Sequence, residues 1–472
     1  MKVAKVRADF TQGKILGKLV VFAIPMIIAN LLQILFNAVD VAIVGQFGGA
    51  KGGDYQAAVG ATGTFIHLLT NLFIGVSIGA NVAMANAFGA KDEKRMDRVV
   101  HSSMLISIVS GVFVMALGLC VSRPVMQLLN TPSNIIDYSV TYLMIYFTSI
   151  PALMIYNFGS SLFRAVGETK KPLLYLCIAG VLNLIINIVT VVFFGWNVVG
   201  VALGTVISQY VSAIWVVIDM IRGHRGLKFR IRGMRFYKKE TITVLRIGVP
   251  MGISSSLFSL SNMLIVGTIN SFGSLAMTGH TISNSLNGFI DAIVSSIERC
   301  SVTIVGQNVG AKKYNRVKRV VGACLFLELV VTLTYSLITI FFGRYLCMLY
   351  NTDSVVIDWT MKALYVTGGL YVFVVLMYGF SCGLKGMGYS IFPMISNIFF
   401  TCIFRVLYVL FIFSNFPSFM HTTTMIYVVY PTTWLLTGLA QMVFYFIIQK
   451  KELKKHAQEL QEEKENQEKV AV

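Results

Sequence analysis

The feature that most constrains this chain is a series of long apolar runs. Each is about 20 residues long, the length that a helix needs to cross the hydrocarbon core of a membrane. With bounds accurate to about four residues, the expected membrane-spanning segments are Leu19–Val44, Ala57–Asn86, Val99–Val121, Tyr138–Leu162, Pro172–Phe194, Val198–Ile221, Ile247–Ile269, Met277–Val305, Val320–Phe342, Ala363–Phe380, Pro393–Phe413 and Met425–Ile448. The first is expected to be retained, because no small-residue cleavage site follows it.

Composition excludes a water-soluble fold. The 472 residues are 56% hydrophobic and only 13% charged, and the mean hydropathy is +0.73. A soluble core cannot hide that much apolar surface. We therefore expect an all-α polytopic membrane protein.

The basic residues fall on alternate sides of the expected spans. Of the 39 Lys and Arg residues, 33 lie on the side of the two termini, four lie on the other side, and Arg299 and Arg405 lie inside spans. This asymmetry follows the positive-inside rule and places both termini in the cytoplasm, at the plasma membrane. Contact with anionic lipid accounts for the net charge of +18 without a nucleic-acid partner.

The chain also repeats itself. Six short matches recur 221 residues apart, among them Phe88–Lys91 with Val309–Lys312, and Pro172 with Pro393; Ile24–Met26 recurs as Val249–Met251 at a spacing of 225. Repeats of six spans keep the same orientation, so we expect two pseudo-symmetric six-helix lobes around a shared axis. The expected divisions are an N-terminal lobe 1–221, a basic cytoplasmic loop 222–246, a C-terminal lobe 247–449 and a charged cytoplasmic tail 450–472.

Asp40 is the first functional candidate. It lies in the apolar stretch Phe22–Gly45, where an ionisable group costs a few kcal/mol and usually marks an ion or substrate pathway. The alternative is an aspartate that only hydrogen-bonds a neighbouring helix. Pro25 lacks a backbone N–H and offers either a hinge or a static kink in the same segment, as does Pro250 in the second repeat.

Four sequence patterns resemble those of multidrug and toxic compound extrusion (MATE) transporters. They are Pro25…Gln33…Asp40…Gly45, Gly89–Lys91, Arg164–Thr169 followed by Pro172, and Gly306–Lys312 (GQNVGAK), the most specific of the four. The resemblance covers about residues 11–450. It implies an antiporter that expels cationic, often amphipathic compounds in exchange for protons or sodium ions.

The resemblance also implies a cation site in the N-terminal lobe. The matching positions are Asp40, Asn183, Asn187 and Thr205, and Asn187 stands where the family more often has an aspartate. With one carboxylate left, we expect a proton to be the coupling ion instead of sodium, with no other cofactor. Counting about 1.5 Å per residue, Asp40, Asn187 and Thr205 all lie roughly 10 Å below the outer membrane face. The alternative is that these side chains only join helices by hydrogen bonds.

The expected cycle is an exchange at that level. A cationic drug binds near ionised Asp40, protonation from outside removes the charge, and the helix bends at Pro25 to close the cavity. Gln33, Asn37, Tyr142 and Tyr146 are expected to line the substrate cavity.

The second half contains its own charges inside expected spans: Asp291, Glu298, Arg299, Glu328 and Arg405. Charges in hydrocarbon must be paired or neutralised, so we expect a structural ion-pair network in which Glu298 or Glu328 meets Arg405. A second proton or substrate site is the alternative.

Other classes of site receive little support. The seven cysteines show no C-x-x-C spacing and the six histidines no ligand pattern, so no metal site or disulfide framework is expected. His280 could titrate. The tail from Lys450 is expected to be a solvated helix or disordered.

Three functions stay open. The first is cation-coupled export of organic cations by a monomer. The second is flipping of lipid-linked saccharides, which needs a cationic cavity for pyrophosphate and would have only Arg299 and Arg405. The third is a membrane-embedded enzyme, for which no compact set of acids, bases or metal ligands is present; we expect no enzymatic activity.

Overall fold

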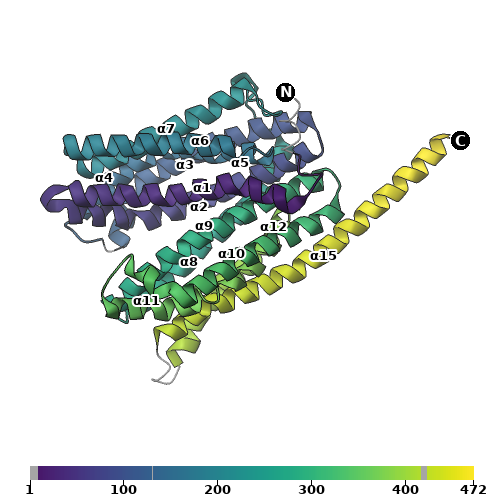
Figure 1. The fold of residues 1–472 in the computed structure, drawn as a ribbon. Coiled ribbons are helices and arrows are strands. Elements are labelled where there is room, and N and C mark those ends of the chain that lie inside the picture. Colours follow the sequence, from purple (N-terminus) through teal and green to yellow (C-terminus); the bar gives the residue numbers. More distant parts are fainter. Residues whose placement is uncertain (1–8, 130, 416–421, 472) are drawn as a thin grey trace. The chain divides into compact units, whose positions relative to one another are not determined.

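The computed structural model describes residues 9–129, 131–415 and 422–471, and their fold is helical throughout (Figure 1). The α-helices are α1 Ile15–Phe47, α2 Gly52–Gly89, α3 Glu93–Leu128, α4 Ile136–Phe147, α5 Ile150–Ala165, α6 Lys170–Asn187, α7 Asn197–Arg222, α8 Lys238–Asn270, α9 Ser274–Gly310, α10 Tyr314–Met348, α11 Ser354–Thr367, α12 Val374–Gly386, α13 Ile391–Ser396, α14 Phe404–Leu407 and α15 Thr423–Ala471. Shorter helical segments are η1 Gly49–Lys51, η2 Ile188–Phe193, η3 Ile231–Gly233, η4 Tyr371–Phe373, η5 Asn397–Ile403, η6 Tyr408–Ile412 and η7 Phe413–Asn415.

Many of these helices have the length and hydropathy of membrane-spanning segments. Within the described residues, ten are long and apolar enough to cross one, and α4 with α5, which meet at 49°, make an eleventh span when taken together. α9 has 37 residues, enough length for a crossing, and takes the place of the expected segment Met277–Val305; its charged residues lower its hydropathy. The all-helical polytopic class predicted from the sequence is confirmed.

The chain divides into two compact units. One, called the N-unit here, groups residues 21–88 and 92–256; the other, the C-unit, groups 1–20, 89–91 and 257–472. Each unit thus contains a short piece of chain from the other half of the sequence. The lobe bounds predicted from the repeats differ from these units at the start of the chain and in the first half of α8, and they stay a prediction.

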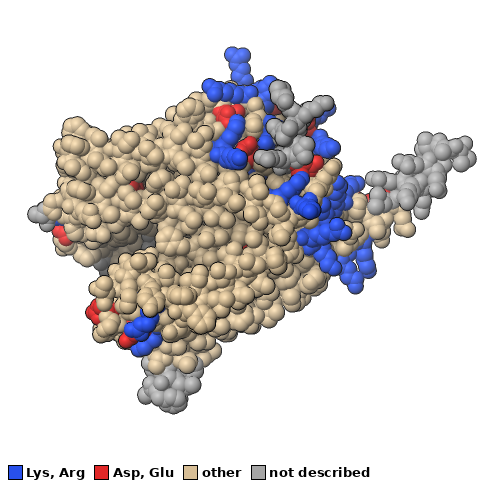
Figure 2. All heavy atoms as spheres, viewed as in Figure 1, with Lys and Arg blue, Asp and Glu red and all other residues tan. Residues whose placement is uncertain are grey.

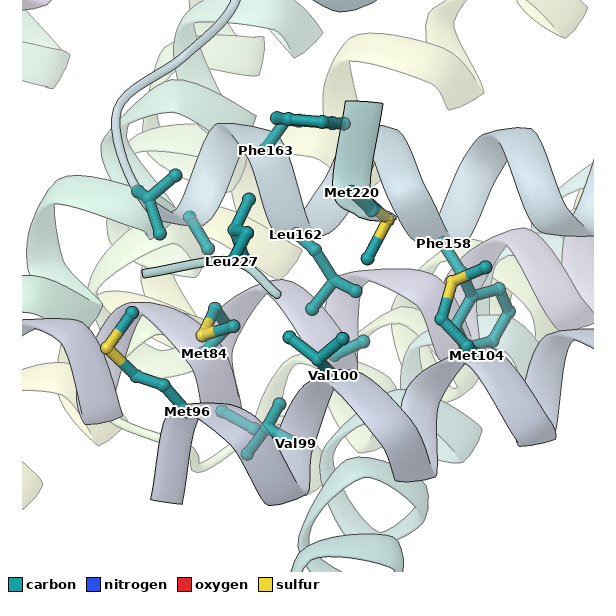
Figure 3. Packing of buried hydrophobic residues seen from close by; sticks show 14 of the residues in the cluster. Met84, Met96, Val99, Val100, Met104, Phe158, Leu162, Phe163, Met220 and Leu227 are labelled. Carbon is teal, nitrogen blue, oxygen red and sulfur yellow. The ribbon is translucent and has the colours of Figure 1, made fainter. Parts of the chain in front are cut away.

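The core of the N-unit gathers sulfur-containing and branched side chains from several helices. Figure 3 shows Met84 of α2, Met104 of α3, Leu162 of α5 and Met220 of α7 within one cluster of buried side chains. Leu227, in the chain after α7, is fully buried in the same cluster. The start of the expected basic loop 222–246 therefore packs against the N-unit.

Glycines bring α2 and the first half of α8 into close contact inside the N-unit. Gly75 and Gly79 face Gly248 and Gly252, two G-x-x-x-G pairs on two helices. A Cβ added at Gly75 would lie 2.3 Å from the Gly252 Cα, and one at Gly79 would lie 2.3 Å from the Val244 carbonyl oxygen. Helices in lipid associate through this kind of backbone approach, which explains why the first half of α8 belongs to the N-unit.

A short segment before α1, residues Asp9–Gly13, is bound to the C-unit. The Phe10 side chain is buried, its N–H donates to Gln307 Oε1 (3.2 Å), and its carbonyl accepts from Arg316 Nε (3.2 Å). Arg316 Nη2 also donates to the Gly13 carbonyl (2.6 Å), and Lys313 Nζ to that of Thr11 (3.0 Å). The motif Gly306–Lys312 and the residues after it therefore form the socket for the start of the chain.

Basic side chains are unevenly distributed over the surface. On the face drawn in Figure 2, the Lys and Arg side chains gather in separate patches. Long stretches of other residues lie between. Such a pattern is typical of spans with basic cytoplasmic loops; the cytoplasmic location of the termini stays a prediction.

The tail continues the last helix. α15 runs on from its apolar part to Ala471, and Tyr389 donates to Glu452 (2.6 Å) while Lys312 pairs with Glu459 (3.6 Å). Of the two expected states for the tail, the helix is the one observed. Its first turns beyond Lys450 are fastened to the C-unit.

Replacing Gly252 by alanine tests the glycine crossing. The added Cβ would lie 2.0 Å from the Leu72 carbonyl oxygen, a backbone atom that cannot rotate away. We expect a loss of about 1 to 3 kcal/mol, the usual cost of overpacking, measured as earlier thermal unfolding in detergent. Gly60→Ala, where the Cβ meets open space, is the control; equal stability of the two variants would contradict the crossing.

Candidate functional site

The structure brings the four predicted coupling residues together in the N-unit, three of them through their side chains and Thr205 through its backbone. Asn187 Nδ2 donates to Asp40 Oδ1 at 2.7 Å. Asn183, with its amide turned to suit its neighbours, also donates to Asp40 Oδ1 (2.8 Å) and accepts from the Thr205 N–H (3.2 Å). The Thr205 side chain itself donates to the Val201 carbonyl (3.1 Å). Asp40 is thus held by amides of α6, and Thr205 joins the cluster through its backbone.

Glycine positions set the distances in this cluster. A Cβ at Gly180 would lie 2.0 Å from the Phe36 ring, so α1 and α6 meet there. A Cβ at Gly204 would lie only 1.9 Å from Asn187 Oδ1, an atom that receives no hydrogen bond from the described residues. The Asn187 amide therefore fills the space that glycine leaves on α7, and its Nδ2 turns toward Asp40.

Aromatic residues border the cluster. The rings of Tyr142 and Tyr146 on α4 stack at a centroid distance of 5.9 Å, and both lie within electrostatic range of Asp40. Asp40 itself is half-buried, and Gln33 and Asn37 on the same helix are exposed. A carboxylate, two amides and two stacked phenols thus occupy one region of the N-unit.

The helix that carries both asparagines changes its winding directly after them. α6 ends at Asn187, and the π-helical segment η2 begins at Ile188. π-helical turns are rare and often mark functional sites. Pro25, in contrast, lies inside α1, which continues through it from Ile15 to Phe47; its role as a hinge stays a prediction.

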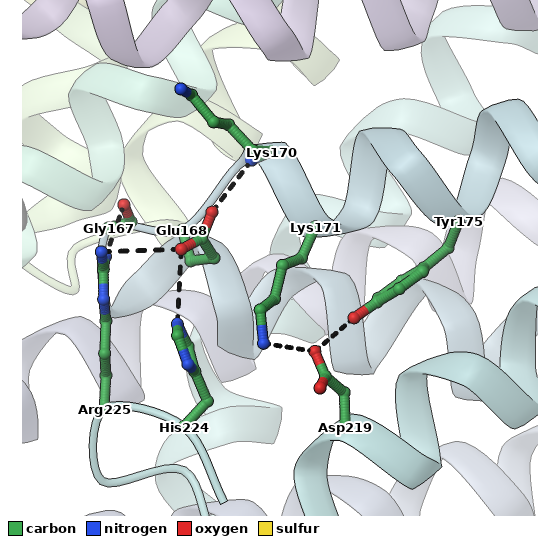
Figure 4. Close-up of polar contacts among 8 residues, drawn as sticks. All are labelled: Gly167, Glu168, Lys170, Lys171, Tyr175, Asp219, His224 and Arg225. Carbon is green, nitrogen blue, oxygen red and sulfur yellow. Dashed lines mark hydrogen bonds and ion pairs between the residues drawn. The ribbon is translucent and has the colours of Figure 1, made fainter. Parts of the chain in front are cut away.

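A second polar group, at the junction of α5 with α6 and of α7 with the loop after it, explains the Arg164–Thr169 motif (Figure 4). Glu168 pairs with His224 (3.3 Å) and Arg225 (3.6 Å), and Arg225 donates to the Gly167 carbonyl (3.2 Å). Gly167 has φ of +80°, which favours glycine. These contacts fasten the turn to the chain after α7.

Figure 4 also shows the neighbouring contacts of Asp219, in the last turn of α7. Its carboxylate pairs with Lys171 Nζ (2.6 Å) and accepts a hydrogen bond from Tyr175. Unlike Asp40, this acid has a cationic partner. Its arrangement is that of a structural fastening between α6 and α7.

The predicted pairing of Arg405 with Glu298 or Glu328 is wrong. Glu298 pairs with Lys385 (2.6 Å), while Glu328 Oε1 accepts from Cys324 Sγ (3.2 Å). Arg405, 1% exposed, donates to Asn262 Oδ1 (2.6 Å) and to Thr433 Oγ1 (3.2 Å). It therefore meets amide and hydroxyl acceptors, and no acid among the described residues.

The other C-unit charges lie on α9. Asp291 Oδ1 accepts from Tyr378 (2.9 Å) and Tyr371 (3.2 Å), and Arg299 is half-buried within electrostatic range of Asp291. Sequence reasoning missed Lys385, which it placed in a loop, and the acceptors Asn262 and Thr433. The sequence shows that these residues are polar and lie in apolar runs. It does not show which of them face one another in the folded protein.

Comparison with known proteins agrees with this architecture. The MatE family model matches residues 25–189 and 250–411, one stretch in each half. The probable multidrug resistance protein YoeA of Bacillus subtilis is 24% identical over 80% of this chain and 82% of its own length. YpnP of the same organism, also a probable multidrug resistance protein, is 28% identical over 66% and 68%. The multidrug export protein MepA of Staphylococcus aureus is 23% identical over 76% and 78%.

Solved structures show the same fold. A MATE protein in a bent conformation superposes with a TM-score of 0.87 at 18% identity, covering 96% of this chain and 99% of that one. An outward-facing MATE family multidrug resistance transporter gives 0.86 at 18% identity over 95% and 98%. Since the family model matches most of the chain and the fold agrees, the protein belongs to the MatE family and has the fold of a MATE transporter.

Proposed function

We propose that this protein exports cationic, amphipathic organic compounds across the plasma membrane in exchange for protons. The observation that carries the proposal is the half-buried Asp40 carboxylate, held by the Asn187 amide at 2.7 Å. The relatives named as multidrug resistance and export proteins support the export of foreign compounds. Transport, and no enzymatic reaction, is the proposed activity.

Among the residues that the structure describes, Asp40 has no cationic partner. Within the described residues, no Lys or Arg lies within ion-pair distance of it, in contrast to Asp219 and Glu298. An uncompensated carboxylate in apolar surroundings favours either a proton or a bound cation. Asp40 can therefore hold one or the other in turn, which is the requirement for an exchanger.

The orientation of the amides favours a proton over sodium. Sodium is a hard cation, and hard cations are bound by several oxygen atoms that point at the ion. Here the amides of Asn187 and Asn183 present N–H groups to Asp40, and the Thr205 hydroxyl is turned to the Val201 carbonyl. Donors thus occupy the places where oxygen ligands would be needed.

The cycle follows from these contacts. With Asp40 ionised, a cationic compound binds near the carboxylate, and the stacked rings of Tyr142 and Tyr146 offer an aromatic surface to it. Protonation from outside removes the attraction and releases the compound. Loss of the charge also weakens the amide bonds to Asp40, so that α1 can bend at Pro25.

Location and partners complete the proposal. The protein acts as a monomer in the plasma membrane with both termini in the cytoplasm, and its partners are small cationic substrates and lipid. The saccharide-flipping alternative needs a cationic cavity. Arg405 offers little to it, because Asn262, Thr433 and the Tyr430 ring already surround the guanidinium.

Asp40→Asn is the first test. The carboxamide keeps the size of the side chain but can neither take up a proton nor attract a cation. We expect proton-driven ethidium efflux in vesicles to fall by more than about tenfold, the effect of losing one interaction of about 1.4 kcal/mol. Protein abundance should not change.

The matched control is Asp137→Asn, an exposed carboxylate of the same unit that pairs with Arg123 (3.2 Å); we expect normal efflux. Sodium and proton gradients are imposed separately on the native protein. Efflux that follows only the sodium gradient would refute the choice of coupling ion, and full pumping by Asp40→Asn would refute the exchange itself.

Gly204→Ala tests the positioning of Asn187. The new Cβ would lie 1.9 Å from Asn187 Oδ1 and must push the amide away from its place against Asp40. We expect the pH dependence of efflux to shift, because Asp40 loses a hydrogen bond that favours its charged form. Gly63→Ala, a position with open space, should leave the profile as it was; an unchanged profile in Gly204→Ala would rule out this role.

A further inference from the structure

A separate cavity lies wholly within the C-unit. Its volume is about 180 Å³, and its walls come from α8, α9, α11, η4, α12 and α15. None of the coupling residues in the N-unit lines it. Asp291 is its acidic residue, and Asn262 lies among its amides.

Asp291 makes one part of the cavity wall negative. The hydroxyls of Tyr371 and Tyr378 both donate to Oδ1 of Asp291, at 3.2 and 2.9 Å. No described residue donates to Oδ2, and the nearest basic residue on the same helix, Arg299, forms no ion pair with it. The two tyrosines therefore fix the carboxylate and leave one oxygen for a ligand.

Arg405 lies behind another part of the wall, where it contacts Asn262. Its guanidinium donates to Asn262 Oδ1 at 2.6 Å and lies over the rings of Tyr430 (4.6 Å) and Phe258 (5.5 Å). With Oδ1 occupied, Asn262 has its N–H₂ group left to donate into the cavity. The buried positive charge behind this wall directs a cation toward Asp291 and an acceptor group toward Asn262.

Aromatic rings make up much of the remaining wall. Trp434 packs against Tyr371 (5.3 Å between centroids) and Tyr430 (6.1 Å), and Tyr427 stacks on His280 (5.8 Å). A carboxylate among aromatic rings is the chemistry that recognises ammonium cations. Asn287 is held at both ends, by Tyr335 (2.7 Å) and Thr367 (2.9 Å), so this wall is preorganised.

We propose that this cavity binds a small ammonium compound with a hydrogen-bond acceptor at its other end, of the size of choline. Drug-sized ligands occupy about 300 to 1,000 Å³, which is more than this cavity offers. Asp291 binds the ammonium group, the rings of Trp434 and Tyr371 surround it, and Asn262 donates to the acceptor. This site goes beyond the proposed function, since it lies in the other unit and needs no exchange with protons.

The test measures choline binding to the purified full-length protein by isothermal titration calorimetry. The comparison ligand is the uncharged isostere of choline in which carbon replaces nitrogen. We expect choline to bind at least about tenfold more tightly, because only the cation gains from Asp291 and the aromatic faces. Asp291→Asn, which still accepts from both tyrosines, should weaken choline binding by at least about tenfold.

Two further variants separate binding from folding. Asp358→Asn, an exposed carboxylate of the C-unit paired with Arg344 (2.9 Å), should bind choline normally. Trp434→Leu keeps an apolar side chain and should weaken choline severalfold while leaving the isostere unaffected. Thermal unfolding of each variant identifies any that is misfolded.

Three results would overturn the proposal: equal binding of choline and its isostere, unchanged choline binding by Asp291→Asn together with Trp434→Leu, or sodium binding that depends on Asp291 while choline does not bind. The proposed function has its own readout, ethidium efflux by the native chain. Either can fail while the other succeeds.

Discussion

Close approach between helices at glycine is the constraint on which the rest of this structure depends. At Gly204 it leaves room for the Asn187 amide, and at Gly180 it brings the Phe36 ring of α1 against α6. At Gly75 and Gly252 the same device joins α2 to α8. Hydrophobic attraction between helices is weak in lipid, so packing and polar contacts at short range carry the assembly.

Charges inside the helical units are held in two ways, by neutral polar groups and by ion pairs. In the N-unit, Asp40 is solvated by amides, which leaves its charge free to be exchanged. In the C-unit, Glu298 is neutralised by Lys385, while Arg405 is surrounded by Asn262, Thr433 and aromatic rings. Neutral hydrogen-bond partners stabilise a buried charge but do not cancel it. The electric field of a charge held in this way still acts on neighbouring groups.

The sequence predicted the helical class and the candidate cluster correctly, but it did not predict which buried charged side chains contact one another. Spans and repeats follow from hydropathy and spacing, which are local properties of the chain. Asp40 could be found because ionisable residues in apolar runs are rare, whereas Asn183 and Asn187 came from the resemblance to MATE transporters. Arg405 was assigned the wrong partner, because helix rotation and neighbour identity depend on packing, and Lys385 was not considered since it counted as a loop residue. The glycine crossing of α2 with α8 was missed for the same reason, although both G-x-x-x-G pairs are visible in the sequence.

The socket for residues Asp9–Gly13 has a practical consequence. Phe10 is buried, and Gln307, Lys313 and Arg316 bond to the backbone around it, only a few residues before α1 begins. An affinity tag or fluorescent fusion joined directly to Asp9 would lie beside these contacts and compete with them. Fusions are better joined behind α15, whose last turns lie well beyond the contacts of Glu452 and Glu459.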